Sequence, residues 1–158
     1  ILMHAIKGQG AYRDMSAICP VDEVSTSLMV FADASFKTQD NCDDVVAALN
    51  ACAQRAGLGG IEVVFGNGAV KNACQVLDYS AGCYVKLPTS EYGGGSIWDF
   101  AATACIIPEA SAWASNIHGE ALDLNRRDST FMNHQGVVFA SSEQLARPLI
   151  DDLSRLLG

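Results

Sequence analysis

Basic residues are scarce in this chain, and so are charged residues in general. Lysine and arginine together number 10 against 18 acidic residues, which gives a formal net charge of −8. Because non-specific nucleic-acid binding needs a basic surface, this balance argues against nucleic acid as a partner. Charged residues make up only 18% of the chain and hydrophobic residues 49%. The composition is therefore that of a folded domain rather than of a disordered segment.

Two further absences concern the membrane and the redox compartment. No hydrophobic run approaches the roughly 18 residues that span a bilayer, and no signal peptide opens the sequence. None of the six cysteines belongs to a Cys-x-x-Cys pair, and most lie among alanine, valine and leucine, as buried free thiols do. A zinc site or a disulfide framework is the alternative for these cysteines. We expect a cytoplasmic protein without a membrane partner.

Apolar runs of strand length alternate with helical patterns along the chain. Runs that suit buried strands lie at 27–31, 61–65, 83–85, 112–115 and 136–140. Helical patterns follow Asn41, Gly68 and Ser142 and include Asp99. Pro148 lies too deep in the last helix for a regular first turn, which predicts a kink or a restart there. The alternation predicts a layered α/β fold, with residues 1–158 as one domain.

The stretch from Gly93 to Cys105 carries the strongest local pattern. Three glycines and a serine precede Trp98 and Asp99, and small apolar residues follow. This pattern places Asp99 at a helix N-terminus, where the helix dipole stabilises an ionised carboxylate. Asp99 is then either a cap that serves its own helix or a ligand in a metal or phosphate site.

A second pattern is the glycine-rich turn Gly66-Asn67-Gly68 between a strand and a helix. Backbone N–H groups at a helix start lack partners, and glycines let a phosphate approach them. Lys71 follows within reach of the same anion as a point charge, although a solvated surface lysine is the alternative. Ser35, in a loop after a strand, faces the same choice between substrate contact and turn former.

Together these segments resemble the inositol monophosphatase superfamily of Mg²⁺-dependent phosphatases. Four segments match family motifs in order: residues 5–12 the Ala-x-x-Gly-x-Gly-Ala-aromatic strand, 66–71 the glycine-rich turn, 98–99 the Trp-Asp pair and, more loosely, 113–122 the Thr-Asp turn. Lys71 and the segment Met132-Asn133-His134-Gln135-Gly136-Val137 look most like the 3'(2'),5'-bisphosphate nucleotidases within the superfamily.

The resemblance implies a Mg²⁺-dependent phosphate monoester hydrolase. It implies that Asp99 is a metal ligand that also borders the substrate, and that Ser35, Gly66, Asn67, Gly68 and Lys71 contact the substrate. The expected substrate is a small phosphorylated molecule, adenosine 3',5'-bisphosphate first and an inositol phosphate second.

One family feature is missing from the sequence. The Asp-x-x-Asp-Gly-Thr loop, which supplies most of the metal shell, has no counterpart, since the segment 40–44 lacks Gly-Thr. The chain therefore resembles the C-terminal portion of the layered α/β/α/β/α sugar-phosphatase fold, without the N-terminal metal-binding part. We expect no catalytic residue within it. Its partners are then the missing half or a second copy, and the alternative to an active enzyme is a catalytically silent fragment or subunit.

Overall fold

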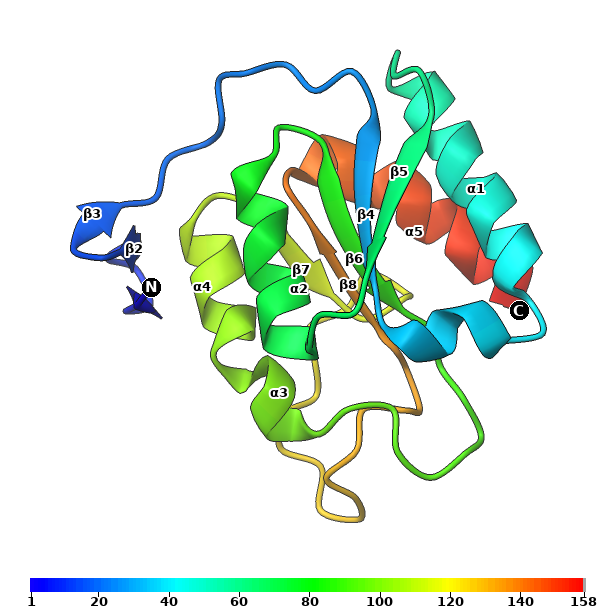
Figure 1. Ribbon diagram of the computed structural model, residues 1–158. Coiled ribbons are helices and arrows are strands. Elements are labelled where there is room, and N and C mark those ends of the chain that lie inside the picture. The colour runs from blue at the N-terminus through cyan, green and yellow to red at the C-terminus, as the bar shows by residue number, and fades with distance from the viewer. Residues whose placement is uncertain (158) are drawn as a thin grey trace.

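The computed structural model describes residues 1–157 and contains two β-sheets (Figure 1). The larger sheet has five strands in the order β5-β4-β6-β8-β7. Its strands are β4 (Leu28–Ala32), β5 (Ile61–Phe65), β6 (Gly82–Lys86), β7 (Trp113–Ser115) and β8 (Val137–Ala140). β4 is parallel to β5 and β6, whereas β8 is antiparallel to β6 and β7. The carboxyl ends of β4, β5 and β6 consequently share one edge of the sheet.

Helices cover both faces of this sheet. One face packs against α1 (Cys42–Arg55) and α5 (Glu143–Leu157), and the other against α2 (Ala69–Gln75) and α4 (Thr103–Glu109). Short helices η1 (Ala34–Thr38), η2 (Val76–Asp78) and α3 (Ile97–Ala101) complete the connections. No helix within the described residues is both long and apolar enough to cross a membrane.

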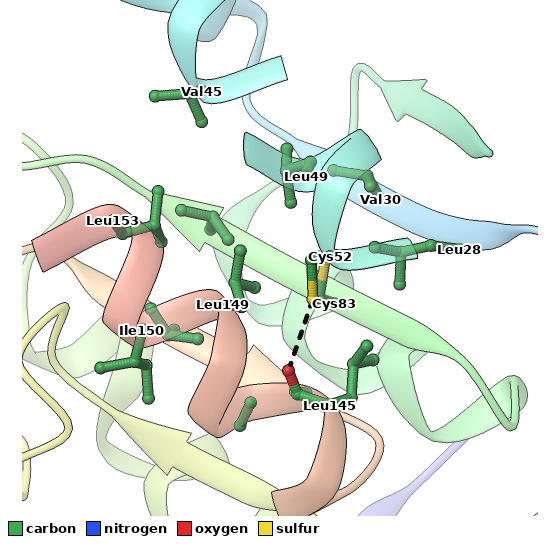
Figure 2. Packing of buried hydrophobic residues seen from close by; sticks show 14 of the residues in the cluster. Leu28, Val30, Val45, Leu49, Cys52, Cys83, Leu145, Leu149, Ile150 and Leu153 are labelled. Carbon is green, nitrogen blue, oxygen red and sulfur yellow. Dashed lines mark hydrogen bonds between the residues drawn. The ribbon is translucent and has the colours of Figure 1, made fainter. Parts of the chain in front are cut away.

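Helical periodicity explains why α1 and α5 lie on the sheet. Val45, Leu49 and Cys52 recur on one face of α1 and are buried. Figure 2 shows Leu49 next to Val30 of β4, and Val45 and Leu149 of α5 belong to the same buried cluster. All six cysteines are free, and of these only Cys52 and Cys83 are fully buried.

The smaller sheet forms an outer layer. It comprises β1 (Met3–Ala5), β2 (Ala11–Arg13) and β3 (Ser16–Ala17) in an antiparallel meander. Figure 1 shows it beside α4, on the side of that helix away from the large sheet. The layers therefore run helix, sheet, helix, sheet, as the sequence predicts for part of an α/β/α/β/α arrangement.

Two local expectations need adjustment. The helix expected around Asp99 consists of two segments, α3 and α4, divided at Ala102, whose backbone remains helical with φ −70° and ψ −44°. Of the kink or restart expected at Pro148, the restart is wrong, because α5 continues through that residue. Pro148 follows five helical residues of α5.

The carboxylate of Glu109 ties the outer sheet to α4. It accepts hydrogen bonds from the N–H groups of Gly8 and Gly10, at 2.7 and 2.8 Å, in the turn between β1 and β2. These bonds lower the pKa of Glu109 below its ordinary value of 4.5. A carboxylate whose pKa is lower in the folded than in the unfolded state stabilises the folded state at pH values above the unfolded-state pKa. This contribution is lost as the pH falls through the folded-state pKa.

We therefore expect Glu109→Gln to lower the melting temperature at neutral pH, where the charge strengthens both hydrogen bonds. The difference from the parent chain should shrink as the pH is lowered from about 5 toward 3, because protonation removes the charge in the parent as well. Thermal melts followed by circular dichroism across this range measure it, with the exposed Glu23→Gln as control. A difference that stays constant with pH would contradict the proposed role of the charge.

Candidate functional site

The predicted site residues gather at the carboxyl edge of the large sheet. Ser35 lies in η1 directly after β4, and the turn Gly66-Asn67-Gly68 follows β5. Lys71 is exposed on α2, whose first residue follows the turn. Asp99 is on α3, which packs against α2. Ligand sites of parallel α/β sheets form at this edge, where loops from several strands converge.

The turn after β5 has the backbone geometry that its glycines predict. Gly66 has φ +96°, a conformation that disfavours residues with a Cβ atom, and added Cβ atoms at Gly66 and Gly68 would meet no atom within 4 Å. The Asn67 side chain turns back to donate to Gln75 Oε1 at 2.8 Å. Within the described residues, the N–H groups of Asn67 and Gly68 have no acceptor. The turn is open toward solvent and presents donors there.

Asp33 is the centre of a polar cluster beside this turn. Its carboxylate follows β4 directly and forms an ion pair with Lys86 at the end of β6. Asn72 Nδ2 donates to Asp33 Oδ1 at 3.0 Å, and the Tyr84 hydroxyl lies 3.2 Å from the same oxygen. Three elements, β4, β6 and α2, are thus joined through one carboxylate.

Burial has two consequences for this cluster: it keeps the Tyr84 phenol protonated, and it makes the missing partner of Asn72 Oδ1 costly. Burial, together with the Asp33 carboxylate, raises the pKa of Tyr84, so its phenol stays protonated and donates. Asn72 is fully buried, and its Oδ1 has no hydrogen-bond partner among the described residues. An unpaired buried acceptor lowers the stability of the folded state, so the cluster contains one polar group that is unsatisfied within the described residues.

Asp99 is the third residue of α3 rather than its cap. Its Oδ2 accepts a hydrogen bond from the N–H of Ser96 at 2.8 Å, which is half of a capping box. The helix that carries Asp99 packs against α2, which carries Asn72 of the Asp33 cluster. One oxygen of Asp99 therefore serves its own helix, as the capping interpretation predicts. The second oxygen, Oδ1, accepts no hydrogen bond from the described residues.

The described residues do not make a complete metal site. No group of three or more histidine, cysteine, aspartate or glutamate side chains lies close enough to hold a metal ion within residues 1–157. The Asp33 carboxylate is already engaged by Lys86, Asn72 and Tyr84. Asp99 can offer one oxygen, whereas Mg²⁺ requires near-octahedral coordination.

Most of the lysines of this acidic chain lie at the same edge of the sheet. Three of the four lysines are here: Lys37 in η1, Lys71 in α2 and Lys86 at the end of β6. Lys37 lies 4.0 Å above the Phe65 ring rather than beside a carboxylate. An anion approaching the turn after β5 would therefore meet N–H donors together with lysine side chains.

Sequence reasoning missed Asp33, Asn72, Tyr84 and Lys86. Asp33 carried a signal, since it is a charged residue directly after a buried strand. Lys86 ends an otherwise apolar strand in the same way. What the sequence does not contain is the strand order, which makes β6 the neighbour of β4 and so pairs these two residues.

Comparison with known proteins finds solved structures with a similar fold, but it identifies no family from the sequence. Neither a family model nor a curated protein matches the chain. Among solved structures, staphylococcal SaIMPase-II bound to inositol monophosphate matches with a TM-score of 0.62 and 18% identity, over 98% of this chain and 56% of that one. SaIMPase-II bound to 2'AMP matches with a TM-score of 0.58 and 19% identity, over 98% and 55%.

An inositol monophosphatase from Anabaena matches similarly, with a TM-score of 0.60 and 16% identity, over 97% of this chain and 56% of that one. The chain spans slightly more than half the length of the solved structures it matches. At these identities the likeness establishes the fold and leaves the chemistry open. The chain has a mixed α/β fold that matches part of the inositol monophosphatase-like structures.

Proposed function

We propose that this chain is the substrate-binding, C-terminal part of a Mg²⁺-dependent phosphate monoesterase. The observation that carries the proposal is the convergence of the glycine turn 66–68, Lys71 and Asp99 at one edge of a sheet with this fold. Backbone donors and lysines suit a phosphate group. Ser35 lies on the neighbouring helix η1 and would contact the rest of the substrate.

Asp99 would contribute one ligand to the metal site. Its Oδ1 is the oxygen available, since Oδ2 serves the N-terminus of α3. One carboxylate is too few for a stable Mg²⁺ site, so the remaining ligands and the groups that activate water would come from outside these 158 residues. We accordingly derive no catalytic step for this chain alone.

Adenosine 3',5'-bisphosphate is the substrate we propose. A ligand with two phosphate groups suits an edge that carries Lys37, Lys71 and Lys86 in a chain of net charge −8. The solved structures with the same partial fold include complexes with inositol monophosphate and with 2'AMP. An inositol phosphate is therefore the second candidate.

The isolated 158-residue chain is expected to hydrolyse both substrates very poorly, and supplying the missing N-terminal metal-binding part should restore turnover. Phosphate release with Mg²⁺ from adenosine 3',5'-bisphosphate and from inositol 1-phosphate measures this. Robust turnover by the chain alone, verified by intact mass, would contradict the proposal that it lacks essential groups. In the restored enzyme, a higher kcat/KM for inositol 1-phosphate would reverse the substrate order.

A further inference from the structure

A polar cleft of about 640 Å³ lies between η1 and the loop that joins β6 to α3. This volume is in the range of small-molecule sites. Figure 1 shows the loop extending beyond the carboxyl edge of the sheet. Hydroxyl and amide side chains line much of the cleft: Ser35, Thr38, Gln39, Asn41, Thr89 and Ser90. The walls therefore suit a ligand rich in hydroxyl groups.

Lys86 links the cleft to the residues around the proposed phosphate site. The side chain of Lys86 lines the cleft and is paired with Asp33, which Asn72 of α2 also contacts. An ammonium group has three N–H donors, and Asp33 is its only acceptor among the described residues. Donors of Lys86 therefore remain for a ligand that lies between the cleft and the glycine turn.

Tyr92 presents an aromatic ring at this cleft. The residue is 88% exposed, yet its ring makes an edge-to-face contact with the ring of Phe131, with the ring centroids 4.5 Å apart. Its loop is held by Asn133, whose Nδ2 donates to the carbonyl oxygens of Thr89 at 3.2 Å and Glu91 at 3.1 Å. An aromatic face that is both exposed and fixed is the geometry of a stacking platform.

The glycines of the loop support this arrangement. Gly94 has φ +81°, and a Cβ atom there would lie 2.8 Å from Cβ of Asn133. Only glycine lets the loop approach Asn133 this closely, and that approach places Tyr92 at the cleft. The position of the Tyr92 ring is thus set by the neighbouring backbone rather than by burial of the ring itself.

We infer that this cleft binds the nucleoside part of a nucleotide substrate, with the base stacked on Tyr92. The inference rests on the proposed function and adds where the nucleoside part of the substrate lies. The carboxylates of Asp40 and Glu91, which also line the cleft, accept hydrogen bonds from ribose hydroxyls, and Lys86 contacts an anionic group of the nucleotide. Inositol phosphate has hydroxyls and a phosphate but no π-face, so Tyr92 separates the two substrate classes.

Binding to the 158-residue chain without metal tests this inference independently of hydrolysis. Isothermal titration calorimetry with adenosine 3',5'-bisphosphate and with inositol 1-phosphate is applied to the parent, Tyr92→Ala and Tyr92→Phe. Loss of one base-stacking contact should weaken nucleotide binding about tenfold in Tyr92→Ala. Tyr92→Phe should bind the nucleotide like the parent, and inositol 1-phosphate should bind equally to all three.

Met15→Ala is the matched control, because Met15 is 81% exposed and lies in the turn between β2 and β3 of the outer sheet, away from the cleft. Nucleotide affinity that is unchanged in Tyr92→Ala, an equal loss for both ligands, or no saturable nucleotide binding by the parent would each overturn the inference. An unchanged affinity in Tyr92→Ala combined with turnover by the restored enzyme would leave the proposed function standing.

Discussion

The substitution Asp99→Asn is expected to abolish most of the activity of the restored enzyme while leaving the fold intact. Activity and folding are expected to respond differently because the two carboxylate oxygens of Asp99 have different surroundings. Oδ2 accepts from the Ser96 N–H within the N-terminal turn of α3, and an asparagine amide oxygen can accept the same bond. The charge that a hard cation prefers is lost. Turnover should fall about a hundredfold or more, because a bound metal supplies several kcal/mol to catalysis.

Stability without metal should change by no more than about 1 kcal/mol, the usual size of a capping effect. The two measurements are steady-state phosphate release at low Mg²⁺ and chemical unfolding in the presence of a chelator. Asp22→Asn, at an exposed loop position, is the control for loss of a negative charge elsewhere. Near-parental turnover of Asp99→Asn at low Mg²⁺ would refute the metal assignment, since a residue with only a capping role tolerates the change.

The strands and helices were largely predictable because their signals are local. The run from Ile61 to Phe65 is β5 with the predicted bounds, and α1 begins just after Asn41, where the helical pattern starts. Gly57 adopts φ +76° just after α1, as a C-terminal glycine does. In each case the physical cause lies within a few residues of the feature it produces.

The side-chain cluster around Asp33 was not predictable, because its cause is long-range. Asp33 and Lys86 are 53 positions apart and meet only because β6 pairs with β4. The sequence also leaves open whether Asp99 serves its own helix, since the hydrogen bond from the Ser96 N–H depends on the local backbone. The glycine turn and Asp99 were found from residue patterns, while the groups that connect them required the sheet order.

Asp33→Ala is expected to be among the most destabilising polar substitutions in the chain. It leaves the Lys86 ammonium without its counter-charge and the Asn72 Nδ2 and Tyr84 hydroxyl without the acceptor that they share. The two charged side chains are 16% and 20% exposed, so water compensates only in part. Removing one partner of a mostly buried pair leaves a desolvated charge, and we expect a loss of about 2 to 3 kcal/mol.

Chemical denaturation of four proteins separates the ion pair from the rest of the cluster: the parent, Asp33→Ala, Lys86→Met and the double variant. The double variant should be less destabilised than the sum of the single changes, because it removes both members of the pair and leaves neither charge without its partner. Glu143→Ala, which breaks the exposed pair with Arg147 on α5, should cost under about 1 kcal/mol. Additive losses, or an Asp33→Ala effect no larger than that of Glu143→Ala, would show that the pair is solvated. In that case the Asp33 carboxylate would not be what holds β4, β6 and α2 together beside the glycine turn.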